Sequence, residues 1–318
     1  MAPDPDPPDP VALRWTRPAP SAGVEPPVAS VPPGTVVYAI GDVHGCSDLL
    51  AALQRGIELD AGMRPARRRV VVYLGDYISR GTDTRGVLDR VIGWRPRGFE
   101  IVTLMGNHEQ MLIGFLDGNL FAGRRWFTHG GREVAAQYLA PDLLPQANRR
   151  APIEDLARLR EHLYAALPSA HRQLLQALAL KHHEGGYLFV HAGIRPGLAL
   201  EAQTSLDLLW IRGRFLDSTA HHGPIVVHGH CVSAAPEIRP NRIGIDTGAW
   251  RTGVLTCLVL EGGERELLQT TAGAPIPALH AGSDQGTKAR ARPEAYAQPA
   301  ATQVPEKKAT RNTIEEEP

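Results

Sequence analysis

The chain has 318 residues, of which 43% are hydrophobic, and this length allows one large or two small domains with a sizeable core. Lys and Arg together number 34, as do Asp and Glu, so the net charge is zero and no basic field is available to hold a nucleic acid. No run of about 18 apolar residues occurs, and the first residues lack the basic and apolar segments of a secretory signal. We therefore expect a cytoplasmic protein with neither nucleic acid nor membrane as a partner, while its oligomeric state stays open.

Both ends of the chain differ in composition from its middle. Residues 1–33 hold eleven of the 27 prolines, which fix φ and remove backbone donors, so we expect an extended or disordered arm there. Residues 272–318 mix Ala, Gly, Gln, Lys and Glu with few apolar anchors and cannot bury enough surface to offset their ordering entropy. The expected folded domain is residues 34–271.

Short β-branched runs recur in this domain, and each is followed by glycine or a polar residue. Nearly continuous apolar runs are typical of strands that are buried on both faces. Helical patterns over 46–59 and 82–94 separate the first three runs, which predicts βαβ units whose strands end at one edge of a sheet. The five runs end at Ile40, Leu74, Met105, Val190 and His228.

The second half of the domain mixes helices and strands. Residues 169–183 form an amphipathic pattern that predicts a helix, and one or two more helices are expected within 131–165. After His230, the runs 242–248, 253–262 and 265–271 predict strands in hairpin succession. The economical fold class is α/β, a two-layer mixed β-sandwich flanked by helices.

Metal-type ligands follow each of the five predicted strands. Carboxylate, imidazole and carboxamide groups together suit borderline divalent ions such as manganese, iron or zinc. The set is too large for one ion, whereas two ions about 3.5–4 Å apart that share a carboxylate would use it and would clamp a phosphoryl group. Arg80 lies on the same loop as one carboxylate, and its guanidinium fork can bind two phosphate oxygens. The ligand-type residues are Asp42, His44, Asp76, Asn107, His108, Glu109, His191, His228 and His230.

Five sequence blocks carry a resemblance to a known family. The blocks read "GDVHG", "GDYISRG", "GNHE", "HAG" and "HGH", in this order along the chain. Together they resemble the PPP-family metallophosphoesterases, the calcineurin-like phosphatases, and the chain is similar in compactness to small bacterial and phage serine/threonine protein phosphatases. The resemblance runs from residue 36 to about residue 261 and implies the calcineurin-like fold with a dinuclear metal site at the strand ends.

The resemblance also implies a role for each matched residue. Asp76 would bridge two divalent ions, with Mn²⁺ expected and Fe or Zn as possible replacements. His108 would be the general acid, and Arg80 and Asn107 would bind the substrate. Arg212 matches the second phosphate-binding arginine, although Arg214 is only two residues away. The first ion would be held by Asp42, His44 and His230, and the second by Asn107 and His191.

The implied reaction is hydrolysis of a phosphomonoester by a hydroxide activated between the two ions, without a covalent phosphoenzyme. The implied substrate is phosphoserine or phosphothreonine in a protein, so the partner would be a phosphoprotein or a small phosphate ester. The alternative is a symmetrical dinucleoside tetraphosphate hydrolase or another small-molecule phosphoesterase on the same scaffold. A non-catalytic binding module is a third class, but the complete set of ligands argues against it.

Several residues near these blocks have competing interpretations. His228 is expected to be a strand residue rather than a ligand, and Glu109 to cap or pair the following helix. His129 could cap a helix or contact the substrate. Ser79 stands where the family pattern has an Asp that orients and charges the catalytic histidine, so His108 is expected to lack that charge unless Asp83 or Glu109 replaces it. The cysteines, Cys46, Cys231 and Cys257, are expected to be reduced thiols, because their number is odd and no CxxC pair occurs.

Overall fold

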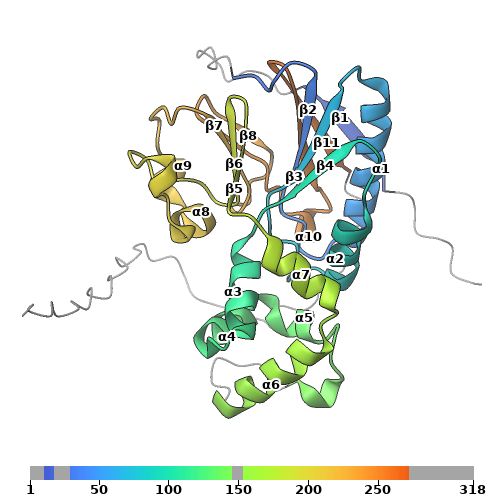
Figure 1. Cartoon of the computed structure of the whole chain (residues 1–318), viewed down its shortest axis with the longest axis vertical. Coiled ribbons are helices and arrows are strands. Elements are labelled where there is room, and N and C mark those ends of the chain that lie inside the picture. The colour runs from blue at the N-terminus through green and yellow to red at the C-terminus, as the bar shows by residue number, and fades with distance from the viewer. Residues whose placement is uncertain (1–10, 18–28, 145–152, 272–318) are drawn as a thin grey trace, which may run out of the picture. The chain divides into compact units, whose positions relative to one another are not determined.

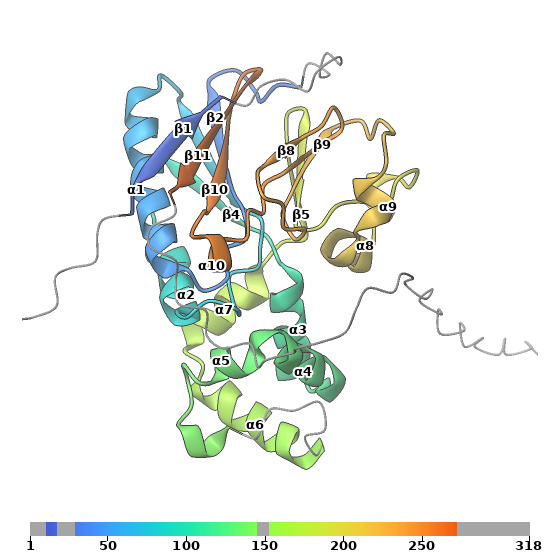
Figure 2. The ribbon, with the colours of Figure 1, turned by 180° about the vertical axis from the view of Figure 1, so that it is seen from behind.

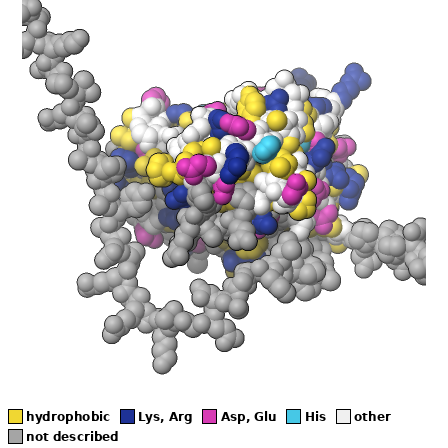
Figure 3. Space-filling view, turned by 90° about the horizontal axis from the view of Figure 1, so that it is seen from below, with side chains coloured by type: hydrophobic (Ala, Val, Ile, Leu, Met, Phe, Trp, Pro, Cys, Tyr) yellow, Lys and Arg dark blue, Asp and Glu magenta, His cyan; other side chains and the backbone are white. Residues whose placement is uncertain are grey.

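The computed structural model describes residues 11–17, 29–144 and 153–271 (Figure 1). The expected C-terminal tail and most of the expected proline-rich arm lie outside the described residues. None of the helices in these described ranges is long and apolar enough to cross a bilayer. Acidic, basic and hydrophobic side chains are interspersed on the face shown in Figure 3.

The first sheet has six strands in the order β1-β11-β10-β2-β3-β4. Strands β2, β3 and β4 are mutually parallel and are linked by helices, as the βαβ pattern predicted. Strand β10 pairs antiparallel with β2 and forms a hairpin with β11. The strand bounds are β1 Leu13–Thr16, β2 Thr35–Ile40, β3 Arg68–Tyr73, β4 Phe99–Thr103, β10 Thr256–Glu261 and β11 Glu264–Thr270.

The second sheet has five strands in the order β5-β6-β7-β9-β8 and faces the first (Figure 2). Its three central strands, β6, β7 and β9, are also parallel to one another. The bounds are β5 Lys181–Glu184, β6 Tyr187–Val190, β7 Ile225–His228, β8 Glu237–Ile238 and β9 Arg242–Gly244.

Helices cover the outer face of each sheet and gather beyond the strand ends (Figure 1). Helices α1 (Ser47–Met63) and α2 (Thr84–Gly93) connect the parallel strands of the first sheet. A group of five follows β4, and two more pack outside the second sheet. These and the last short helix are α3 Asn107–Leu116, α4 Leu120–Trp126, α5 Arg132–Ala135, α6 Ile153–Ala166, α7 Ser169–Ala177, α8 Ser205–Trp210, α9 Gly213–Leu216 and α10 Ala249–Thr252. Single 3₁₀ turns span Pro141–Leu143 and Leu200–Ala202.

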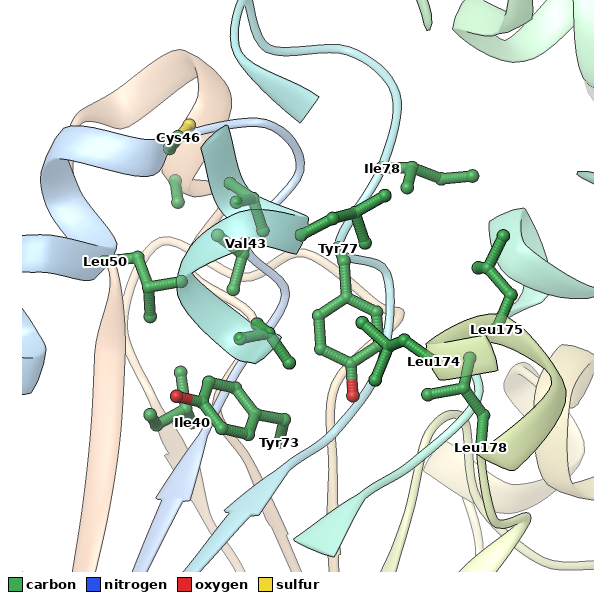
Figure 4. Packing of buried hydrophobic residues seen from close by; sticks show 14 of the residues in the cluster. Ile40, Val43, Cys46, Leu50, Tyr73, Tyr77, Ile78, Leu174, Leu175 and Leu178 are labelled. Atoms are coloured by element: carbon green, nitrogen blue, oxygen red, sulfur yellow. The ribbon is translucent and has the colours of Figure 1, made fainter. Parts of the chain in front are cut away.

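Side chains of the central strands alternate between two cores. On β2, Tyr38 and Ile40 pack toward the helices, whereas Val37 and Ala39 pack against the second sheet. This is the period-two geometry of a strand whose two faces are both buried. Figure 4 shows the helix-side core around the strand ends, where Tyr77 lies between Ile40, Val43 and Tyr73 on one side and Leu174, Leu175 and Leu178 of the α7 segment on the other. The structure therefore has the two-sheet α/β architecture that the sequence predicted.

Three local predictions differ from the structure. Residues 13–16, expected within an irregular arm, form β1 and pair with β11 over four residues. They occupy the edge of β11 that β10 leaves unpaired, and nothing in the local sequence indicates this pairing. Helix α7 ends at Ala177 rather than 183, because Lys181–Glu184 pairs antiparallel with β6. The three runs predicted after His230 are not one hairpin series, because β9 pairs with β7 and β8 in the second sheet, whereas β10 and β11 form a hairpin in the first.

Candidate active site

Loops from six parallel strands converge on one site. Hydrogen bonds between strand ends join the two sheets there: His191 Nδ1 lies 2.9 Å from the Leu74 carbonyl, and the His230 N–H donates to Asp42 Oδ2 at 3.0 Å. The sequence predicted five of these strand ends. The strands and their residues are β2 with Asp42 and His44, β3 with Asp76, β4 with Asn107 and His108, β6 with His191, β7 with His230, and β9 with Asp246.

Two buried imidazoles are held in a fixed tautomer. His44 Nδ1 lies 2.9 Å from the Ile78 carbonyl, and His191 makes the same kind of contact with Leu74. A carbonyl oxygen only accepts hydrogen bonds, so each Nδ1 carries the proton and each Nε2 keeps a lone pair. Burial lowers the pKa of His44 to about 3 and that of His191 to about 4, which keeps both rings neutral.

These lone pairs face other acceptors rather than donors. His44 Nε2 lies 3.3 Å from Asp76 Oδ2, and His191 Nε2 lies 3.0 Å from Asn107 Oδ1 and 3.6 Å from Asp76 Oδ2. Buried acceptors that face each other repel unless a proton or a cation lies between them. Two groups, His44–Asp76–His108 and Asp76–His191–His230, have ligand atoms within 4.8 Å of one another and share Asp76.

Asp42, Asp76 and Asp246 form no ion pair with a described arginine or lysine, and the charges of Arg80 and Arg212 only partly offset the burial of Asp76. Burial, and then the neighbouring Asp246, raise the pKa of Asp42 well above its usual value, and burial raises the pKa of Asp76 to about 7. Asp42 Oδ1 and His230 Nε2 are buried with no hydrogen-bond partner among the described residues. Divalent cations would satisfy these orphaned atoms, so the donor set fits metal ions.

The site loops hold strained backbone conformations. His44, Asp76, Ser79, Arg80 and His230 all have positive φ, and they are the only non-glycine residues with positive φ in the described ranges. Such conformations cost about 1–3 kcal/mol each and persist at functional sites. A Cβ on Gly229 would collide with Asp42 Oδ1, so the glycine between His228 and His230 leaves room for that carboxylate.

Glu109 supports the loop that carries Asp76. Its carboxylate accepts hydrogen bonds from the backbone N–H groups of Gly106 and Asp76 at 2.9 Å, and of Tyr77 at 2.9 Å and Ile78 at 3.2 Å. This confirms the expectation that Glu109 caps its helix, and it adds a role that the sequence did not reveal. The start of α3 and the Asp76 loop are thereby tied to one buried side chain.

Glu109→Ala is expected to lower the free energy of unfolding by at least about 3 kcal/mol, because each buried donor left unsatisfied costs about 1–3 kcal/mol. Glu109→Gln keeps one acceptor oxygen and should lower the free energy of unfolding by less. Urea denaturation of both variants measures the difference. Equal stability of Glu109→Ala and wild type would contradict the bracing role.

Arg80 and Arg212 lie in the wall of the site cavity. Arg212 Nη1 lies 3.6 Å from Cys231 Sγ, and the Arg80 guanidinium lies 5.2 Å from the Trp250 ring centroid. Arg214, the alternative considered from the sequence, is an exposed residue of α9 and does not line the cavity. The lining residues are His44, Asp76, Arg80, Asn107, His108, His129, Trp210, Arg212, His230, Val232, Asp246 and Trp250.

The position of Ser79 leaves His108 without a carboxylate partner on Nδ1. His108 Nδ1 and Ser79 Oγ are both buried, and neither has a hydrogen-bond partner among the described residues. Glu109 is occupied by backbone N–H groups, and Asp83 accepts from Gly86 at the start of α2. The described structure therefore shows neither of the substitute partners that the sequence left open.

His230 is placed differently from the sequence expectation. Its Nδ1 lies 2.9 Å from Asn107 Oδ1 and its ring centroid lies 5.0 Å from that of His191, whereas only its backbone reaches Asp42. The structure thus groups the His230 ring with Asn107 and His191 rather than with Asp42 and His44. His228, as expected, is a buried strand residue, with its ring 5.2 Å from that of Phe215.

Sequence reasoning missed Asp246 and left His129 undecided, yet both line the site cavity. Asp246 follows the three-residue strand β9 and is buried, and it accepts a hydrogen bond from the Gly248 N–H at 2.9 Å. The run "RIGID" carries the same kind of signal as the other five blocks, an apolar run followed by a ligand-type side chain. The three cysteines are free thiols, with Cys46 and Cys257 buried and Cys231 half-buried.

Residues 35–248 match the calcineurin-like phosphoesterases, and the chain belongs to this family. It is therefore a metallophosphoesterase by fold and by family, as the five sequence blocks indicated. The family match ends two residues beyond Asp246 and includes all six strand ends that build the site.

Three curated relatives show the range of activities among similar proteins. The chain is 31% identical over 162 residues to a symmetrical bis(5'-nucleosyl)-tetraphosphatase of Acidovorax sp., covering 50% of this chain and 44% of that one. It is 26% identical to an asymmetrical bis(5'-nucleosyl)-tetraphosphatase of Anoxybacillus flavithermus, covering 69% and 88%. It is 32% identical to serine/threonine-protein phosphatase 1 of Salmonella typhimurium, covering 35% and 49%. The chain thus spans less than half of the symmetrical enzyme and about half of the protein phosphatase.

Two solved structures are also similar. A putative diadenosine tetraphosphatase is 19% identical with a TM-score of 0.48, and the alignment covers 78% of this chain and 97% of that one. A cold-active protein-tyrosine phosphatase of a Shewanella species is 18% identical with a TM-score of 0.45, covering 78% and 86%.

Proposed function

We propose that this metallophosphoesterase hydrolyses a phosphate ester or anhydride at a centre of two divalent metal ions. The observation that carries the proposal is the set of buried lone pairs that face one another around Asp76. A pair of bound ions supplies an activated water and a clamp for the phosphoryl oxygens. Carboxylate, imidazole and amide ligands suit Mn²⁺, Fe or Zn²⁺, and we propose Mn²⁺.

The contacts support a revised assignment of ligands. Asp42 and His44 would hold one ion together with Asp76, because His44 Nε2 faces Asp76 Oδ2. Asp76 would also serve the second ion, beside His191 and Asn107. The His230 ring would join this second group, because it lies against Asn107.

Arg80, Arg212 and His108 would act on the substrate. The two guanidinium groups line the cavity and would bind phosphate oxygens and stabilise the charge that develops on them. His108 lines the cavity, with its Nε2 4.0 Å from Asp76 Oδ2, and would deliver a proton to the leaving oxygen. Asn107, which belongs to the second ligand group, would also orient the phosphoryl group.

Dinucleoside tetraphosphates are the substrate class that we propose first. The sequence favoured a serine/threonine protein phosphatase and named a symmetrical tetraphosphatase or another small-molecule phosphoesterase as its alternative. Relatives of both tetraphosphatase kinds support the dinucleoside class: the asymmetrical one aligns over 88% of its length and the symmetrical one over 44%, against 49% for the protein phosphatase. Phosphoserine and phosphothreonine in proteins remain the second candidate.

Steady-state kinetics with Mn²⁺ test this choice. Diadenosine tetraphosphate is expected to have a kcat/KM at least about tenfold above that of a phosphoserine peptide, a ratio that one well-placed polar contact can supply. EDTA should abolish both activities, and the nucleotide products identify the bond that is cut. A higher kcat/KM for the peptide would favour the second candidate, whereas turnover that resists EDTA would contradict a metal centre.

A further inference from the structure

The helix α4 is broken where it reaches the cavity. The helical run is interrupted within Phe127–Gly131, where His129 (φ −122°, ψ 28°) and Gly130 (φ 95°) leave helical geometry. A Cβ on Gly130 would lie 2.9 Å from the Arg80 amide nitrogen, so the break packs directly against the Arg80 loop. His129, at this break, lines the cavity.

The His129 ring is fixed by its own helix. Its Nδ1 lies 2.7 Å from the Arg125 carbonyl oxygen and 2.9 Å from Thr128 Oγ1. Because the carbonyl can only accept, Nδ1 carries a proton, and Nε2 is the nitrogen that remains available to a ligand. The ring stands nearly perpendicular to that of His108, with 6.1 Å between centroids. The fixed ring therefore borders the residue to which we assign proton delivery.

The Arg125 side chain stacks on Trp210, which lines this cavity, although Arg125 is not itself a lining residue. Its guanidinium carbon lies 3.9 Å from the centroid of Trp210, a lining residue whose Nε1–H donates to Gln110 Oε1 at 2.6 Å. Stacking on an indole fixes the plane of a guanidinium while its N–H groups stay open. Arg125 is exposed, and no described carboxylate lies within ion-pair distance of it. The Arg125 guanidinium is thus fixed next to the cavity, with its N–H groups free to bind an anion.

We propose that Arg125 and His129 form a binding subsite for a second phosphate group, attached to the scissile phosphoryl group on its leaving side. This deepens the proposed function and rests on it, because the leaving side is defined by the role of His108. Arg80 and Arg212 already serve the scissile group, so Arg125 would be surplus for a simple monoester. A planar fork stacked on Trp210 matches the paired oxygens of a phosphate. The ligand class is therefore a phosphate chain of at least two units.

Direct binding measurements test the subsite independently of turnover. Calorimetric titration of the Mn²⁺-loaded protein with ADP and with orthophosphate gives two Kd values for each variant. Arg125→Gln is expected to raise the Kd of ADP by about tenfold or more, the effect of losing a charged hydrogen-bond donor to phosphate, and that of orthophosphate by much less. Arg55→Gln, at an exposed arginine of α1, is the matched control for charge.

Two isosteric variants separate contact from capping at His129. Gln places a polar atom near the position of Nε2, whereas Asn places one near Nδ1, so His129→Gln should keep ADP affinity better than His129→Asn. An ADP affinity that survives Arg125→Gln, or one that His129→Asn keeps and His129→Gln loses, would overturn the proposal. Failure of the proposed function would instead show as normal ADP binding without hydrolysis of any phosphate ester.

Discussion

Asp76→Asn is expected to lower kcat/KM by more than about 100-fold. Mutation of a residue that only hydrogen-bonds to a metal ligand already lowers metal affinity or activity by about 10–100-fold, and a ligand to both ions should matter more. Asp76 Oδ2 faces His44 Nε2 at 3.3 Å and His191 Nε2 at 3.6 Å, so it serves both ligand groups. A neutral amide cannot offset the charge of two cations. Activity and bound metal per chain, measured on the same sample, show both losses together.

A matched control is available for this substitution. Asp83→Asn keeps the side-chain oxygen that accepts from the Gly86 N–H at the start of α2, and it should leave activity close to wild type. The assignment of Asp76 would be wrong if Asp76→Asn kept its metal and most of its rate while His230→Ala lost both.

Arg80→Ala and Arg212→Ala are each expected to lower kcat/KM by about 10²- to 10³-fold, the range for removing one donor from a preorganised anion site. Metal content should stay unchanged, because neither guanidinium belongs to the ligand groups around Asp76. Steady-state assays with p-nitrophenyl phosphate measure the loss of kcat/KM without contributions from a larger leaving group.

Arg214→Ala is the control for this pair, because Arg214 is exposed on α9 and lies outside the cavity wall. Its kcat/KM should remain near that of wild type. A large loss at Arg214 together with none at Arg212 would transfer the phosphate-binding role to Arg214.

The strand ends were predictable because their signal is local. An apolar run followed by glycine and a ligand-type side chain identifies both the strand and the edge at which it ends. Asp246 was not predicted as a site residue, because β9 has only three residues, Arg242–Gly244, and its run was interpreted as part of a hairpin series. The choice of sheet for β9 is made by pairing with β7, which is distant in sequence.

The same limit explains the other differences. Proline content describes the local chain, whereas β1 forms because Leu13–Thr16 finds the free edge of β11 some 250 residues away. The partner of His230 is likewise set by how the two sheets meet, since its ring lies beside Asn107 although its backbone contacts Asp42. An exposed arginine on a helix has no sequence signal of its own, so the role of Arg125 could not be predicted. It follows from the contact of its side chain with Trp210, which is distant in sequence.

We propose that residues from the ends of six strands form one centre for two metal ions. Metal analysis of the purified protein after saturation with Mn²⁺ and removal of free ions is a direct test, because the count does not depend on any choice of substrate. Two ions per chain are expected in the wild type and fewer in His191→Ala, with hydrolysis of p-nitrophenyl phosphate lost when the ions are stripped and restored when they return. A chain that binds no ion, or one that hydrolyses the ester at full rate after its metal has been removed, would contradict it.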